Sequence, residues 1–76
     1  MSLEIKVKQI LENFEESPST NIVEILNLIQ STFQSSITQD YLMNKLKLIS
    51  NSTDEKEKKK LCKNLMPYFY WYLQGL

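Results

Sequence analysis

Hydrophobic residues recur along the chain at steps of three and four positions, the spacing that places side chains on one face of an α-helix. The first such stripe has four members: Leu3, Val7, Ile10 and Phe14. Ser2 precedes the stripe as a candidate N-cap, and Pro18 follows it. Because a proline pushes the residue before it out of helical geometry, the pattern predicts a first helix over residues 2–16.

A second apolar stripe begins after a polar residue that can cap a helix. Its members are Ile22, Ile25, Leu26, Ile29 and Phe33. Glu24 lies three residues after Asn21, so the two form a candidate capping box, and the pattern predicts a helix over residues 21–34. Apart from Glu24 the segment is nearly uncharged. We therefore expect it to lie at the centre of the fold, with neighbours on more than one side.

The third stripe has a similar start, in which Ser36 and Gln39 form the candidate capping box. We expect its buried face to hold five residues: Ile37, Tyr41, Leu42, Leu46 and Ile49. Met43 and Leu48 lie near the edges of that face. Four residues that prefer turns and caps, over positions 51–54, end the segment, so the pattern predicts a helix over residues 37–50.

The fourth segment opens with acidic residues and continues with a run of lysines. Ser52 and Glu55 form its candidate capping box, and acids precede lysines at the four-residue spacing that stabilises a solvated helix face. The pattern predicts a helix over residues 53–66, which Pro67 either kinks or splits from a segment over residues 67–74. The expected buried stripe is Leu61, Leu65 and Phe69, with Tyr72 or Leu73.

These four helices predict an all-α fold. Connections of roughly three to five residues suit antiparallel neighbours, so we expect a small antiparallel four-helix bundle in a single domain over residues 1–76. One glycine and two prolines are too few for a turn-rich β fold. A chain this short buries a small core, and association with a partner is one way to supplement its stability.

The composition lacks the residues on which most catalytic and metal sites depend. The chain has no histidine, one cysteine and one glycine, so we expect no zinc site, no internal disulfide and no glycine-rich phosphate loop. We therefore predict no enzymatic activity, no cofactor, no metal and no small-molecule substrate. Cys62 lies close to lysines, and it is either a reactive thiol of lowered pKa or a half-buried, inert helix residue.

Charge is unevenly divided along a chain whose formal net charge is zero. Residues 1–40 hold two lysines and six acidic residues, whereas residues 41–76 hold seven lysines and three acidic residues. The halves either attract each other within one fold or present a dipolar surface that orients a partner. The first residues show no signal pattern, and no apolar run is long enough to span a membrane, so we expect a cytoplasmic protein.

Five consecutive aromatic residues occur at positions 68–72. At about 100° per residue, five helical positions point all round the axis, so one buried face cannot hold all five rings. We expect Phe69 to face inward, and at least one of the exposed rings to contact a partner, either another protein or a second copy of the chain in a homodimer. The predicted partner-binding residues are Tyr68, Tyr70, Trp71, Lys59 and Lys63.

Three alternatives compete with this interpretation. Lysines followed by tryptophan and tyrosine are typical of a peripheral contact with membrane headgroups. A small DNA-binding regulator would offer four side chains of the third helix to a groove, although the chain lacks arginine, the commonest base reader: Gln39, Asn44, Lys45 and Lys47. In size, helix count and composition the chain resembles bacteriocin immunity proteins of low-GC bacteria. That resemblance implies a cytoplasmic, non-catalytic helical bundle that acts at the membrane face, with a C-terminal part that discriminates partners.

Overall fold

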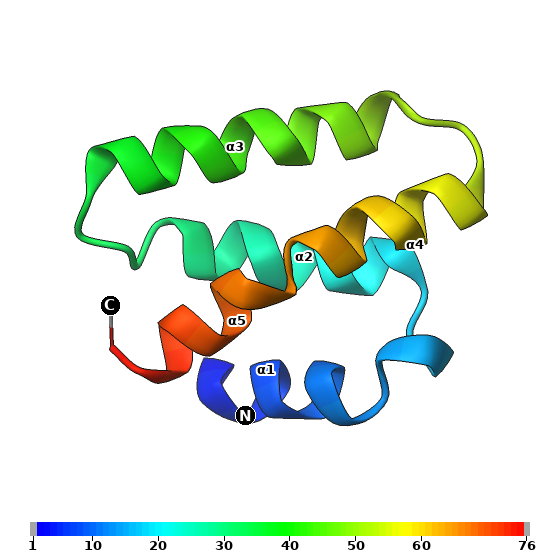
Figure 1. The fold of residues 1–76 in the computed structure, drawn as a ribbon. Helices are drawn as coiled ribbons and strands as arrows, with labels where there is room; N and C mark the ends of the chain where they lie inside the picture. Colours follow the sequence, from blue (N-terminus) through cyan, green and yellow to red (C-terminus); the bar gives the residue numbers. More distant parts are fainter. Residues whose placement is uncertain (1, 76) are drawn as a thin grey trace.

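The computed structural model describes residues 2–75, which fold into five α-helices and one short 3-10 helix (Figure 1). In chain order these are α1 Leu3–Glu12, the 3-10 helix η1 Phe14–Glu16, α2 Ser19–Gln30, α3 Ser36–Asn51, α4 Glu55–Asn64 and α5 Met66–Leu73. Over these residues there is no β-strand, and no helix is both long and apolar enough to cross a membrane. The predicted all-α class is confirmed. Five helices are present where four were predicted, so the four-helix bundle is not confirmed.

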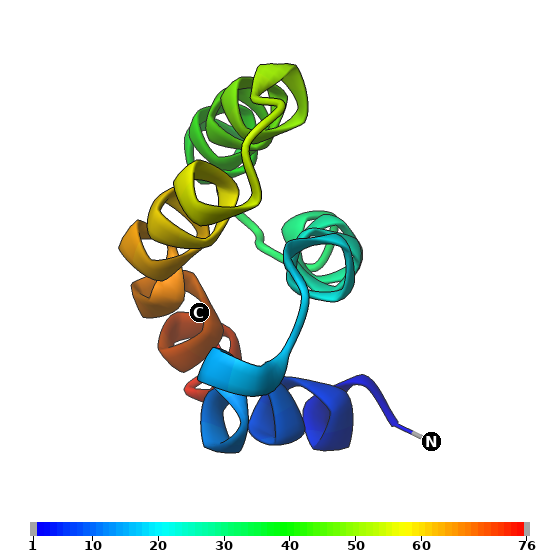
Figure 2. The same cartoon turned by 90° about the vertical axis from the view of Figure 1, so that its right-hand side faces the viewer.

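Helix α2 lies at the centre of the fold and contacts α1, α3, α4 and α5. In Figure 2, where α2 is seen nearly end-on, the other helices follow an arc around one side of it, in the order α3, α4, α5, α1. Four hydrophobic side chains of α2 are buried by these neighbours: Ile22, Ile25, Leu26 and Ile29. The prediction that the second, nearly uncharged helix is central is therefore confirmed.

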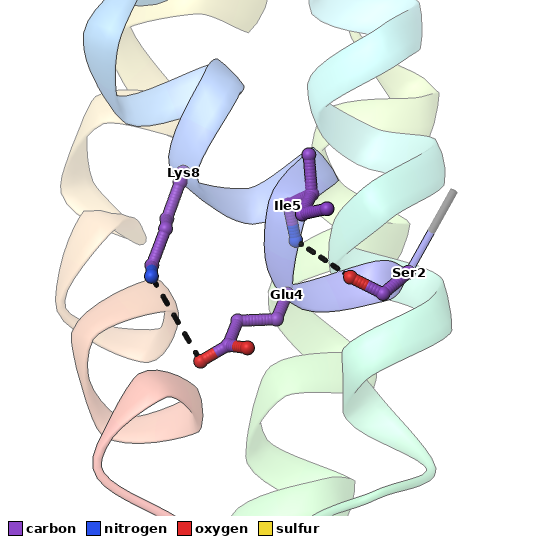
Figure 3. Close-up of polar contacts among 4 residues, drawn as sticks. All are labelled: Ser2, Glu4, Ile5 and Lys8. Atoms are coloured by element: carbon purple, nitrogen blue, oxygen red, sulfur yellow. Dashed lines mark hydrogen bonds and ion pairs between the residues drawn. The ribbon is translucent and has the colours of Figure 1, made fainter.

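The start of α1 shows the capping that its own sequence predicts. The Ile5 amide donates to the Ser2 hydroxyl oxygen at 3.2 Å, so Ser2 is the N-cap (Figure 3). One turn along, the Lys8 ammonium lies 4.0 Å from the Glu4 carboxylate. Both side chains are exposed, so this pair contributes only about 0.3 kcal/mol. Local sequence alone accounts for this end of the helix.

The three predicted capping boxes are wrong. Helix α2 already begins at Ser19, so Asn21 lies inside its first turn. Ser35 caps α3, because its hydroxyl accepts from a helix amide at 3.3 Å, and Asp54 caps α4 by a carboxylate contact of the same length. Two serines stand side by side at the start of α3, and an asparagine, a serine, a threonine and an aspartate precede α4. Each of these residue types can act as an N-cap, so local sequence does not select one of them.

Helix α1 ends at Glu12, earlier than the predicted residue 16. Asn13 leaves helical geometry, with φ −122° and ψ 34°, and the chain tightens into η1. The Asn13 carbonyl accepts from the Ser17 hydroxyl at 2.8 Å and from the Ser17 amide at 3.0 Å, and these two bonds close the turn. The tight turn directs Phe14 into the core, where it is buried.

The predicted break near Pro67 is present, and it splits the helix. Leu65 separates α4 from α5 with φ −98° and ψ 4°, and its amide donates to the Cys62 carbonyl at 2.9 Å. Pro67 lies in the first turn of α5, where its missing N–H leaves no helical bond unmade. The break therefore falls two residues before the proline that causes it.

Helix α3 buries only three hydrophobic side chains: Leu42, Leu46 and Ile49. The prediction that Ile37 and Tyr41 are also buried is wrong, since they are 79% and 56% exposed. The physical reason is position, because α3 is the outermost helix and contacts only α2 and α4. Two neighbours on one side cover a narrow stripe and leave the rest of an apolar surface uncovered.

A side chain from α4 supplies the cap that α2 lacks in its own sequence. The buried Ser19 donates twice to Glu55, from its amide at 2.9 Å and from its hydroxyl at 2.6 Å. The hydroxyl bond first and the amide bond second lower the pKa of the Glu55 carboxyl below its ordinary value. A carboxylate at a helix N-terminus is also favoured by the helix dipole. Glu55 therefore ties α4 to α2 instead of completing a capping box with Ser52.

Candidate partner-binding surface

An apolar groove runs between α3 and the junction of α4 with α5. Its volume is about 340 Å³. Helix α3 contributes one wall, and the residues on either side of the Leu65 break contribute the other. The lining residues are Tyr41, Lys45, Leu48, Ile49, Leu61, Asn64, Leu65, Pro67, Tyr68 and Trp71. We refer to this feature as the α3–α5 groove; Lys45 is the one charged residue in its lining.

Tyr68 lies in the core and packs against the exposed ring of Trp71. It was predicted as a partner-binding residue, but it is only 7% exposed and belongs to the hydrophobic core. Its ring makes edge contacts with Phe33, at 6.0 Å between centroids, and with Trp71, at 5.0 Å. Burial raises the pKa of the Tyr68 hydroxyl, and nearby Tyr41 raises it further. Tyr68 therefore orients its neighbours in the groove more than it presents a surface of its own.

Trp71 is 41% exposed and lies where the groove meets a second cavity. The second cavity has a volume of about 440 Å³, and its lining is Phe33, Gln34, Ser35, Thr38, Trp71 and Gly75. The edge contact with Tyr68 packs one side of the indole against the core. An aromatic side chain that is held from below and open on two sides is well placed to be covered by a partner.

The remaining aromatics of α5 divide between the core and the surface. Phe69 is fully buried, as predicted, and Tyr72 and Leu73 pack partly buried against the core. Tyr70 is 50% exposed and lines neither the groove nor the second cavity. The helical geometry that forbids burial of all five rings thus leaves Tyr70 and Trp71 outside the core, on different faces of α5.

The two predicted lysines have different roles. The Lys59 ammonium donates to the carbonyls of Phe14, Glu15 and Ser17, and it lies 4.8 Å from the centre of the Phe14 ring. These contacts close the C-terminal end of η1, so the charge of Lys59 is engaged within the fold. Lys63 is exposed on α4 and remains a prediction as a partner contact.

Sequence reasoning missed the contribution of α3 to this surface. Tyr41 and Leu48 are 56% and 57% exposed, and both line the groove. The Lys45 ammonium lies 5.2 Å from the centre of the Tyr41 ring and covers one of its faces. The sequence does contain a pattern that indicates this contribution of α3. A second stripe on the helix follows steps of four, three and four residues: Ile37, Tyr41, Asn44 and Leu48.

The side chains of α3 that were predicted to read DNA bases are partly engaged in contacts within the protein. The Gln39 side-chain amide donates to the Phe33 carbonyl, and Lys45 is held over Tyr41. Asn44 and Lys47 are exposed on α3. Two of the four predicted base-reading side chains are therefore engaged in contacts within the fold.

The thiol of Cys62 lies in the core and is not part of the groove lining. Cys62 is fully buried, and desolvation raises the pKa of its thiol to about 11, so the thiolate is disfavoured at neutral pH. Among residues 2–75, no group of three or more His, Cys, Asp or Glu side chains is placed to hold a metal ion. The groove lining supplies aromatic rings, aliphatic side chains, one amide and one ammonium.

Comparison with known proteins adds no family to these observations: no family model, no curated protein and no solved structure matches the chain.

Proposed function

We propose that the protein is a non-catalytic protein-binding module that contacts its partner through the α3–α5 groove and the aromatic side chains beside it. The observation that carries the proposal is the position of Trp71. Its indole lies against buried Tyr68, at 5.0 Å between ring centroids, and remains exposed beside two cavities. Tryptophan and tyrosine seated in pockets are the side chains that most often dominate the energy of protein interfaces.

Preorganisation supports this assignment. Association costs free energy when loose side chains become fixed, and the cost falls when they are held before the partner arrives. Trp71 is already restrained by Tyr68, and Tyr41 is already covered on one face by Lys45. Little further ordering is needed when a partner covers these two rings.

The character of the lining favours a protein partner over a small polar ligand. Sites for small ligands combine an apolar pocket with several convergent polar groups that fix orientation. The groove offers Lys45 and Asn64 amid aliphatic and aromatic residues, and exposed Tyr41 and Leu48 continue its apolar surface outward. An apolar surface that extends beyond its cavity suits a helix or a segment of another chain.

The proposal includes a cytoplasmic location. The lone cysteine is buried in the core as a thiol, and a chain whose stability draws on no disulfide suits a reducing compartment. The fluorescence of Trp71 distinguishes this proposal from a peripheral membrane contact of the kind that the immunity-type alternative implies. A blue shift of that emission with anionic vesicles would favour the membrane, and an unchanged spectrum would remove it.

The direct test is cross-linking of the tagged protein in its native cells, followed by mass spectrometry of what is attached. We expect a protein attached through peptides of α3 or α5, and we expect Tyr41→Ala and Trp71→Ala to lose it. Ile5→Ala is the matched control, because Ile5 is also an exposed hydrophobic residue but lies on α1. A partner retained equally by all three variants would contradict the proposal.

A further inference from the structure

The outer face of α3 carries an apolar stripe that the other helices of residues 2–75 leave largely exposed. Ile37, Tyr41 and Leu48 are all more than half exposed, with Asn44 between them on the same face. Helix α3 contacts only α2 and α4 and lies at the outside of the molecule in Figures 1 and 2. We call these four residues the α3 stripe; through Tyr41 and Leu48 it is continuous with the α3–α5 groove.

The α3 stripe is complementary to itself. When two copies of α3 lie antiparallel with Ile37 of each opposite Leu48 of the other, Tyr41 falls opposite Asn44 of the other copy. Each contact then occurs twice, as a two-fold axis requires. The register pairs apolar residues at both ends and places an aromatic ring over an amide at the centre.

The charges beside the α3 stripe match the same register. Asp40 and Lys47 are both exposed, and seven residues are nearly two helical turns, so they lie on one flank of the stripe. A two-fold axis between antiparallel helices brings that flank against the same flank of the second copy. Along the helix axis, Asp40 then lies about 3 Å, or two residues, from the level of Lys47 of the second copy. Lys47 of the first copy pairs with Asp40 of the second in the same way at the other end.

A parallel pairing would be opposed by charge. Lys45 lies on the opposite flank of the stripe, where its ammonium is held over Tyr41. Parallel helices bring opposite flanks together, so Lys47 of one copy would approach Lys45 of the other. Like charges across an interface disfavour that arrangement, whereas the antiparallel arrangement forms two opposite-charge pairs.

We infer that the partner of this surface is a second copy of the chain, docked antiparallel along α3 with an Asp40–Lys47 pair at each end. The inference rests on the proposed function and names the occupant of the surface. Tyr41 then lies within the dimer contact and Trp71 lies beside it, because Trp71 lines the same groove as Tyr41 and Leu48.

Sedimentation equilibrium of the full chain over a range of concentrations is the first test. We expect a reversible dimer, and we expect Leu48→Glu to raise its dissociation constant by about tenfold or more. Leu48 is exposed in the single copy, so the variant should fold, and circular dichroism checks that it does. Ile5→Glu, on α1, is the control that should leave the dimer unchanged. A wild-type chain that stays monomeric throughout, or a dimer indifferent to Leu48→Glu, overturns the inference.

Charge exchange tests the antiparallel register itself. Asp40→Lys alone and Lys47→Asp alone should each weaken the dimer several-fold, because each homodimer then carries two like-charge contacts. An equimolar mixture of the two variants should recover wild-type association, since both opposite-charge pairs re-form between unlike chains. A mixture no tighter than the variants alone overturns this register. The chain could prove monomeric in sedimentation and still cross-link to a different protein that Trp71→Ala no longer binds. That result would overturn the inference of a homodimer and leave the proposed function in place.

Discussion

Helices α2 and α3 contain six and seven hydrophobic residues, but the fold buries them to different extents. Helix α2 is contacted by four helices and buries Ile22, Ile25, Leu26 and Ile29. Helix α3 is contacted by two helices and leaves Ile37, Tyr41 and Leu48 in solvent. The count of hydrophobic residues in a helix therefore does not decide how many of them are buried in this protein; the number and placement of the neighbouring helices does.

The comparison also locates the candidate function. Exposed hydrophobic residues scattered singly are common on protein surfaces, but a stripe that continues into a groove is not. Here the uncovered side of α3 adjoins Trp71, which was expected at the surface from the sequence of α5. Two elements that are distant in sequence thus combine into one apolar face.

The strongest test of the difference between α2 and α3 is to make the same leucine-to-alanine substitution in each helix. Leu26→Ala, on α2, should lower the free energy of unfolding by about 3 kcal/mol, because it leaves a cavity at a fully buried position. Leu48→Ala, on α3, should change it by less than about 0.5 kcal/mol. Urea unfolding followed by circular dichroism, at dilute concentration to avoid association, measures both. Equal losses would mean that α3 is covered in solution.

The second largest effect concerns the contact that closes η1 against α4. Lys59→Met should lower the free energy of unfolding by about 1–2 kcal/mol, because the carbonyls of Phe14 and Ser17 lose a charged donor. Lys60→Met, at an exposed neighbouring position, is the control and should have little effect. Similar thermal midpoints for the two variants would show that the Lys59 contacts contribute nothing.

The cap between Ser19 and Glu55 should appear as a pH dependence. The folded state lowers the pKa of the Glu55 carboxyl, so its contribution is present above the ordinary value of 4.5 and is lost as pH falls through the lower, folded value. Thermal midpoints of the wild type should therefore fall more steeply in acid than those of Glu55→Gln. Glu57→Gln, on the exposed side of the same helix, should keep the wild-type profile. Parallel profiles for wild type and Glu55→Gln would contradict the role of the cap.

The smallest expected effect is on the exposed side of α3. Lys45→Gln removes the ammonium that lies 5.2 Å from the centre of the Tyr41 ring, and it should lower the free energy of unfolding by about 0.5 kcal/mol or less. Guanidinium unfolding measures the change in the free energy of unfolding precisely enough to distinguish Lys45→Gln from Leu26→Ala. Lys47→Gln is the control. A loss of several kcal/mol would place Lys45 in the core and undo the contrast between α2 and α3.

Much of the fold was predictable because helices follow local rules. The periodic stripes located the helical regions, although they did not separate η1 from α1 and left open whether the last region is one kinked helix or two. The near absence of charge in the second region predicted its central position. The boundaries were predicted less well, since several neighbouring residues can cap the same helix, and Ser35 and Asp54 were chosen over Ser36 and Ser52. Glu55 could not be assigned from local sequence, because its partner Ser19 is 36 residues away.

About half of the candidate surface was predictable. Helical geometry predicted that the five rings of α5 cannot all be buried, but not which of them are exposed. Trp71 is exposed, as expected, whereas Tyr68 was expected outside and lies inside, and Tyr41 was expected inside and lies outside. In each of these two errors the helix and its periodicity were right. What was missing was the identity of the neighbour that covers one side of the helix.

The sequence by itself determined that the chain is helical, that its last helical segment is interrupted near Pro67, and that five adjacent rings cannot share one buried face. Only the tertiary structure decided that Lys59 bonds to the carbonyls of η1, that Tyr68 supports Trp71, and that the second stripe of α3 remains open. The reason is that periodicity describes how side chains are distributed around one helix axis. Which part of that distribution is buried depends on the other helices, and their arrangement is a property of the whole chain.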